Sequence, residues 1–141
     1  MEVMYIATEY CEQWELFEYV FYSEPMSEST IRYFFRQICD TVNYMHQCSI
    51  SHRDLKVENI LLDRTFTLKI SDLGHASFMD LDVERVGTEI YCAPEILNCE
   101  HHCGKKADVF ACGVILFLFM AKDYPFEMKA TSTDRYYSYI A

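Results

Sequence analysis

The chain has 141 residues, which is enough for one domain with a hydrophobic core of its own. Apolar residues make up 51% of the chain and aromatic residues 16%, so the composition argues against a disordered protein. The net charge of −10 argues against a basic surface for nucleic acid or lipid and favours a solvated acidic surface. We therefore expect neither a nucleic-acid partner nor a membrane partner.

The cysteine pattern and the N-terminus favour an intracellular protein. None of the seven cysteines forms a Cys-x-x-Cys pair, so reduced thiols are expected. Met1 is followed by Glu2, without the basic stretch of a signal peptide. The longest apolar run, residues 109–121, is too short to span a bilayer and is typical of a buried helix. We expect a cytoplasmic protein.

The first part of the chain is expected to contain a strand and two helices. Residues 3–8 favour a strand, and a short helix is expected to open at residues 15–17. Ser27 is the expected N-cap of a second helix. Apolar residues then recur with helical spacing at positions 31, 34, 35, 38, 42 and 45. This pattern predicts a core-facing helix of roughly fifteen residues, with His46 as a polar cap at its end.

Residues 52–59, with the sequence HRDLKVEN, bring three kinds of reactive side chain together ahead of the strand-like run 60–62. Phosphoryl transfer needs a carboxylate that orients a hydroxyl, a cation beside the moving phosphoryl group and an oxygen ligand for Mg²⁺. Asp54, Lys56 and Asn59 can supply these three groups.

Three motifs give the chain a family resemblance. Residues 52–59 fit the pattern H-R-D-L-x-x-x-N at every fixed position. After an expected strand at 68–70, residues 71–74 (SDLG) resemble the DFG motif, with Leu73 as the large apolar side chain needed for packing. Residues 87–95 match GTxxYxAPE. The chain thus resembles the eukaryotic protein kinase superfamily, in its Ser/Thr branch, and most closely the calcium/calmodulin-dependent and AMP-activated kinases.

The resemblance implies an α+β, protein-kinase-like fold, with residues 1–141 as a partial protein kinase domain. Residues 1–11 would form the last N-lobe strand and the hinge. Residues 12–141 would form an incomplete C-lobe, mostly helical with short β-hairpins, and the N-lobe would be largely absent. Asp108 would be a buried carboxylate on the central helix that accepts backbone N–H bonds from the catalytic loop, and another helix would begin at residues 134–141.

The resemblance also implies an activity. It implies phosphorylation of Ser and Thr in protein substrates, with ATP and Mg²⁺ as cofactors. Asp54 would be the catalytic base and Lys56 the cation on the γ-phosphate. Asn59 and Asp72 would be the metal ligands.

A set of residues is expected to contact the nucleotide. The backbone of Glu9 and Cys11 would meet the adenine edge, and Glu15 would meet the ribose. The full set implied by the resemblance is Glu9, Cys11, Glu15, Glu58, Asn59, Leu61 and Asp72.

The alternative function is a non-catalytic, kinase-like C-lobe that docks or regulates other proteins. The four glycines, at positions 74, 87, 104 and 113, leave no Gly-rich loop of the G-x-G-x-x-G type. The ATP-binding lysine of the V-A-I-K motif is also missing from the sequence. We therefore expect no measurable kinase activity from the chain as written.

Acidic side chains suggest substrate preference and regulation. Glu15 and Glu58 are expected to bind one arginine, three positions before the phosphorylated residue of the substrate. The alternative is that Glu15 touches only ribose and Glu58 only solvent. Glu84, near Asp82, is expected to pair with Arg53 without phosphorylation. A solvated acidic loop is the alternative there.

Two further expectations concern residues 95–103. Glu95 is expected to lack an ion-pair partner. Cys99, His101, His102 and Cys103 all carry zinc-binding side chains, but four ligands so close in sequence cannot easily surround one tetrahedral ion. A surface loop is expected there instead.

Overall fold

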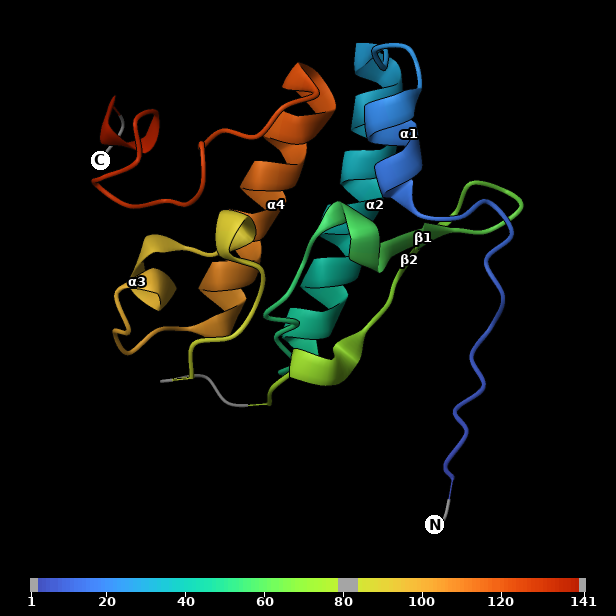
Figure 1. Cartoon of the computed structure of the whole chain (residues 1–141). Helices are drawn as coiled ribbons and strands as arrows, with labels where there is room; N and C mark the ends of the chain where they lie inside the picture. Colours follow the sequence, from blue (N-terminus) through green and yellow to red (C-terminus); the bar gives the residue numbers. More distant parts are fainter. Residues whose placement is uncertain (1–2, 79–83, 140–141) are drawn as a thin grey trace.

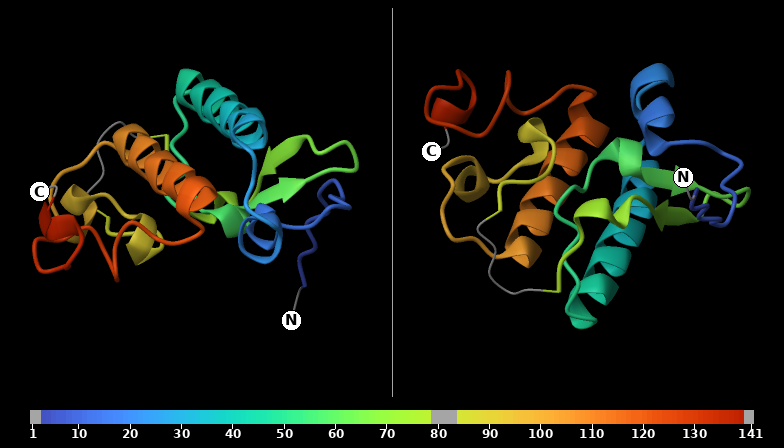
Figure 2. Two further views of the ribbon diagram at one scale, coloured as in Figure 1. Left: turned by 90° about the horizontal axis from the view of Figure 1, so that it is seen from above. Right: turned by 60° about the horizontal axis from the view of Figure 1, so that its bottom comes forward.

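Helices α2 (Glu28–Gln47) and α4 (Gly104–Ala121) lie side by side and form the frame of the molecule (Figures 1 and 2). The structure is a computed structural model that describes residues 3–78 and 84–139. In chain order, the shorter elements are α1 (Leu16–Tyr22), β1 (Ile60–Leu62), β2 (Leu68–Ile70) and α3 (Pro94–Leu97).

The helix predicted after Ser27 is confirmed as α2. The Ser27 hydroxyl accepts the backbone N–H of Thr30 at 3.2 Å, which satisfies one of the free donors at the helix start. Phe34, Ile38 and Val42 recur every four residues and form one buried face. The helix has 20 residues, longer than the apolar stripe alone indicated.

Helix α4 is apolar around most of its circumference, which is typical of a helix in the centre of a fold. Ile115, Leu118 and Phe119 are at most 1% exposed and belong to one core with residues of α1, α2 and the strands. The predicted buried helix is therefore confirmed. Among the residues that the structure describes, no helix is both long enough and apolar enough to span a membrane.

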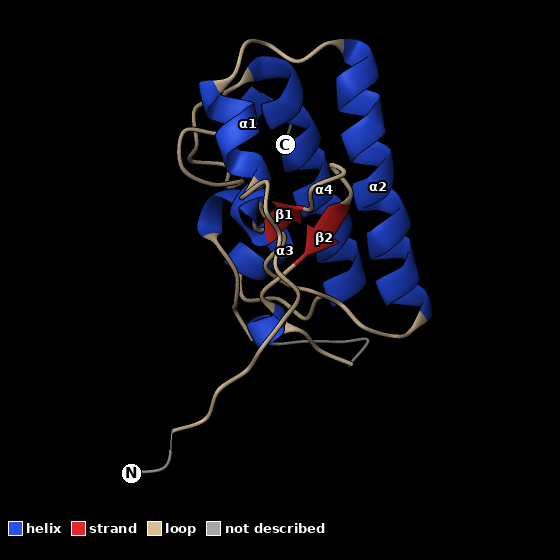
Figure 3. Cartoon of the chain, turned by 90° about the vertical axis from the view of Figure 1, so that its right-hand side faces the viewer, coloured by secondary structure: helices blue, strands red, loops and turns tan. Residues whose placement is uncertain are grey.

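Strands β1 and β2 form a small antiparallel hairpin, with Ile60 opposite Ile70. The segment before α1 is attached to the end of β1, because Gln13 N–H donates to the Leu62 carbonyl and Leu62 N–H donates to the Trp14 carbonyl, both at 3.0 Å. Figure 3 shows how small the strand content is beside the helices. The expected mostly helical α+β fold with a short hairpin is confirmed.

Two predicted elements are not formed. Residues 3–8 are extended and exposed, with Ile6 at 85%, but they form no strand. High β-propensity yields a strand only where a neighbouring strand accepts its backbone hydrogen bonds, and no described residue does so here. The helix expected at 134–141 is reduced to a 3₁₀ turn at Tyr137–Tyr139, and residues 140–141 lie outside the described part.

Asp134 explains why the chain turns instead of forming that helix. Its carboxylate accepts backbone N–H bonds from Met128 and Lys129 on one oxygen, at 2.9 and 3.3 Å. The other oxygen accepts those of Tyr136 and Tyr137, at 3.0 and 3.2 Å. One side chain thus closes the segment between Met128 and Tyr137 into a loop.

We expect this loop to weaken in acid. Burial alone would raise the pKa of Asp134, but the backbone N–H donors outweigh it and lower the pKa below the ordinary value of 3.8. The carboxylate therefore stabilises the loop above that value, and the contribution is lost as the pH falls through the lower folded pKa. NMR shifts of the Tyr136 and Tyr137 amides should then move toward unstructured values.

Two variants provide the controls for this prediction. Asp134→Asn should show a loosened loop already at pH 7, with no further acid step. Asp123→Asn should keep the acid step, because Asp123 accepts only the neighbouring N–H of Tyr124. An unchanged acid step in Asp134→Asn would contradict the assignment.

Candidate active site

The loop at residues 52–59 is anchored to α4 by one buried carboxylate. Asp108 accepts the backbone N–H of His52 on Oδ2 and that of Arg53 on Oδ1, both at 2.8 Å. These are the bonds expected from the sequence. His46, expected to be a polar cap, instead places its Nε2 2.8 Å from Asp108 Oδ2 and connects the end of α2 to the same carboxylate.

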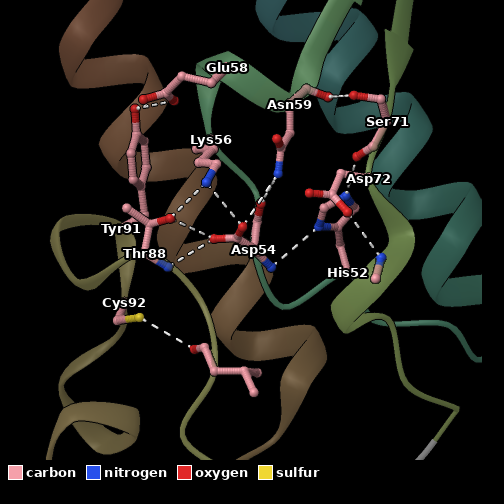
Figure 4. A network of polar contacts seen from close by, with 12 residues as sticks. His52, Asp54, Lys56, Glu58, Asn59, Ser71, Asp72, Thr88, Tyr91 and Cys92 are labelled. Carbon is pink, nitrogen blue, oxygen red and sulfur yellow. Dashed lines mark hydrogen bonds and ion pairs between the residues drawn. The ribbon is translucent and has the colours of Figure 1, made fainter.

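His52 links this loop to the segment after β2. The side chain is fully buried, and its Nδ1 accepts the N–H of Asp54 at 3.2 Å. The ring proton is therefore on Nε2, which donates to the Ser71 carbonyl at 3.0 Å. Ser71 N–H in turn donates to the Asn59 carbonyl at 2.8 Å. Asp72, the next residue in the chain, is therefore close to Asn59. Figure 4 shows these side chains around Asp54.

The Asp54 carboxylate is at the centre of the polar network in Figure 4. Its Oδ1 accepts both the N–H and the hydroxyl of Thr88, at 2.8 and 2.9 Å. Its Oδ2 lies 3.2 Å from Lys56 Nζ and 3.4 Å from Asn59 Nδ2. Lys56 Nζ also donates to the Thr88 hydroxyl at 2.9 Å. Asp54 and Lys56, the two expected catalytic residues, are therefore held together by Thr88.

Thr88 is a site residue that the sequence reasoning missed. In the sequence it is only one position of the GTxxYxAPE match, without a role of its own. The signal available was its place next to Gly87, in a motif that the fold brings back to the loop at residues 52–59. Only the folded chain shows that its backbone and its side chain both bind Asp54.

Asn59 and Asp72, the two residues expected to ligate a metal, lie in the two segments that the bond from Ser71 N–H to the Asn59 carbonyl joins. Asn59 is 7% exposed and uses its Nδ2 as a donor to the Asp54 carbonyl at 2.9 Å, which leaves its Oδ1 as the available acceptor. Asp72 has a left-handed backbone (φ 58°) and accepts the N–H of Gly74 at 3.2 Å through one oxygen. Mg²⁺ needs only one or two protein ligands beside phosphate oxygens and water, so this donor set fits the ion.

The comparison with protein families decides the identity of the fold. A family model described as protein kinase domain matches residues 1–140. The chain belongs to the protein kinase domain family.

This kinase domain is similar to several Ser/Thr kinases. It is 43% identical over 127 residues to serine/threonine-protein kinase SAPK3 of Oryza sativa subsp. indica, an alignment that covers 86% of the chain and 38% of the relative. It is 44% identical to serine/threonine-protein kinase SRK2A of Arabidopsis thaliana, over 86% of the chain and 35% of the relative. For CBL-interacting serine/threonine-protein kinase 8 of Arabidopsis thaliana the identity is 41%, over 88% and 29%. The chain thus spans 38% or less of the length of these relatives.

Part of the expected nucleotide site lies at the segment before α1. Cys11, Glu15 and Leu61 line one open hollow of about 310 Å³, together with Tyr10 and Trp14. Burial, followed by the charge of a nearby glutamate, raises the pKa of Cys11, which makes its thiol a poor nucleophile at neutral pH.

Glu9 and Glu58 are not among the residues that line this hollow. Glu9 pairs with Lys69 at 2.9 Å, and Lys69 is the cross-strand neighbour of Leu61, so Glu9 is close to the hollow. Glu58 instead accepts a hydrogen bond from the Tyr91 hydroxyl at 3.3 Å. Burial raises the pKa of Tyr91, so its hydroxyl remains a donor.

Glu84 lies where it can pair with Arg53, as expected. The distance between Arg53 and the Glu84 carboxylate is 3.4 Å, and the arginine side chain is only 8% exposed. Arg53 also donates through Nε to the His75 carbonyl. Asp82, the other acidic residue of that expectation, lies outside the described residues.

The remaining expectations have mixed outcomes. Among the residues described, no ion pair of Glu95 is found, and no group of at least three His, Cys, Asp or Glu residues is arranged to hold a metal ion. Leu73 was expected to pack as a large apolar side chain, but it is 57% exposed. It follows the left-handed Asp72 and opens a 3₁₀ turn, Leu73–His75, that has no buried residue.

Proposed function

We propose that a protein containing this domain transfers the γ-phosphoryl group of ATP to Ser or Thr in protein substrates. The observation that supports the proposal best is the position of Asp54, which Lys56, Asn59 and Thr88 hold from both carboxylate oxygens. Phosphoryl transfer depends mainly on positioning and electrostatics, and a carboxylate fixed in this way suits that requirement.

Asp54 would accept a hydrogen bond from the hydroxyl group of the substrate. An ionised carboxylate has about four acceptor sites, and the two bonds from Thr88 fill those of Oδ1. The contact with Asn59 at 3.4 Å is the longest on Oδ2 and the weakest. Replacement of this contact by a Ser or Thr hydroxyl would orient the nucleophile beside Lys56, whose ammonium group can stabilise the moving phosphoryl group.

The cofactors of the proposal are ATP and Mg²⁺. Asn59 and Asp72 would hold the metal, and Cys11, Glu15 and Leu61 line the hollow proposed for the nucleoside. When bound, Mg²⁺ would neutralise negative charge on the phosphate oxygens. The loop around Asp54 contributes the orientation of the acceptor hydroxyl and of the lysine.

The proposed substrates carry a basic residue, preferably arginine, three positions before the phosphorylated residue. Glu15 and Glu58 would bind its guanidinium group in a forked arrangement. Among the described residues, Glu58 accepts one long bond, from Tyr91, so its carboxylate keeps acceptor capacity for an arginine.

The proposal is tested by kinase assays on a longer protein that contains this chain. Asp54→Asn should lower kcat by about 10²- to 10⁴-fold, because the base is lost while the shape is kept. The control Asp123→Asn should leave kcat unchanged. Peptides with arginine at the third upstream position should be preferred over alanine peptides, and Glu58→Ala should reduce this preference. Unchanged phosphorylation by Asp54→Asn would refute the function.

A further inference from the structure

A second hollow lies beside the first turn of α1 and has no place in the proposed reaction. Gln13, Trp14, Glu18 and Tyr19 line it, and its volume is about 400 Å³. It therefore combines two aromatic side chains with one carboxylate. Figure 1 shows the segment before α1 running next to the hairpin of β1 and β2, to which the backbone of Gln13 and Trp14 is hydrogen-bonded.

Trp14 combines an exposed side chain with an unfavourable backbone conformation. Its φ of 64° lies in the left-handed region, which favours glycine and disfavours a large side chain. The backbone cannot relax easily, because the bonds of Gln13 and Trp14 to Leu62 fix it at the end of β1. The side chain remains 74% exposed, so the strain is not offset by burial of the indole ring.

The other wall of the hollow is fixed as well. The Tyr19 hydroxyl donates to Gln13 Oε1 at 3.2 Å, and its ring contacts that of Phe66 edge to face, with centroids 5.8 Å apart. Glu18 has no hydrogen-bond or ion-pair partner for its side chain anywhere in 3–78 or 84–139. A carboxylate without a cation among the described residues thus lines the same hollow as two aromatic side chains.

We propose that this hollow binds an arginine side chain from a basic segment of a partner protein. A guanidinium group can stack on the faces of Trp and Tyr and at the same time donate hydrogen bonds to a carboxylate. Lysine fits less well, because its ammonium group is compact and strongly hydrated. The net charge of −10 would attract a basic segment to the surface. An anionic or purely apolar partner would leave Glu18 without a counter-charge.

The test uses the chain itself, because Trp14 is its only tryptophan and lines the hollow. Trp14 also lines the hollow proposed for the nucleoside, so the Glu18 and Tyr19 variants below assign the signal to this hollow. A short peptide with one arginine between alanines is titrated at low salt while the indole emission is followed. We expect a saturable change, and about tenfold weaker binding when citrulline replaces arginine. Equal affinity of the arginine, citrulline and leucine peptides would overturn the proposal.

Variants separate binding from a structural role of the same residues. Glu18→Gln and Tyr19→Leu should each weaken binding several-fold, whereas Glu24→Gln, on an exposed glutamate outside the hollow, should not. Trp14→Gly, followed by calorimetry, should lose the peptide but keep or raise the melting temperature, since glycine tolerates this backbone. Undiminished peptide binding by Trp14→Gly would refute the site. Indole emission that changes with protein concentration alone would identify a second copy as the occupant and would also refute it.

Discussion

Asp108→Ala is expected to destabilise the domain more than any other single polar substitution in the site. The side chain is 1% exposed and is the acceptor for the N–H groups of His52 and Arg53. Alanine leaves both donors buried without an acceptor, at about 1–3 kcal/mol each. His46 loses its partner as well. We therefore expect a loss of about 2–6 kcal/mol in the free energy of unfolding.

Urea unfolding of the chain measures this loss, and two further variants grade it. Asp108→Asn keeps one acceptor oxygen and should lose less than alanine does. Asp40→Ala, on the exposed face of α2, should change the midpoint little, because its side chain is 76% exposed and its pair with Arg36 is long at 3.9 Å. Equal midpoints for Asp108→Ala and Asp40→Ala would show that the anchor is unimportant.

Gly87→Ala should release the segment that holds Asp54. Gly87 has a φ of +98°, and a Cβ there would lie 2.6 Å from the carbonyl oxygen of Arg53. Because the obstacle is backbone, the neighbour cannot move away cheaply. The strain of about 1–3 kcal/mol should open the bond between Thr88 N–H and Asp54. We expect the Thr88 amide to exchange with solvent about 10- to 100-fold faster.

Gly113→Ala is the matched control for that experiment. No atom lies within 4 Å of a Cβ at Gly113, in the middle of α4. Alanine should therefore stabilise the helix slightly, by about 0.5–1 kcal/mol, and leave Thr88 exchange unchanged. Thr88 exchange in Gly87→Ala as slow as in the parent chain would contradict the expected clash.

The chemistry of the site could be predicted where its residues are close in sequence. Asp54, Lys56 and Asn59 lie within six positions, and the fold brings them together around one carboxylate. The role of Asp108 was also predictable, because the family resemblance places a carboxylate on the central helix. The predicted helices followed from the apolar periodicity of α2 and the apolar run of α4.

The parts that could not be predicted depend on contacts between distant residues. Thr88 binds Asp54 across 34 positions, and neither residue carries a local signal of the other. The absence of a strand at 3–8 reflects the lack of a pairing partner, which propensity does not encode. Asp134 replaces the expected helix by a loop because its carboxylate competes for backbone donors over a short range.

The anchor at Asp108 has a consequence for biosynthesis. It joins α4 to the end of α2 and to the loop at residues 52–59, across 62 and 56 positions of the chain. The chain emerges from the ribosome with its N-terminal part first, so the catalytic loop is exposed well before α4 has been made. Ordered geometry around Asp54 therefore arises only late in synthesis, and a nascent chain that ends before residue 108 cannot hold the loop in its final form.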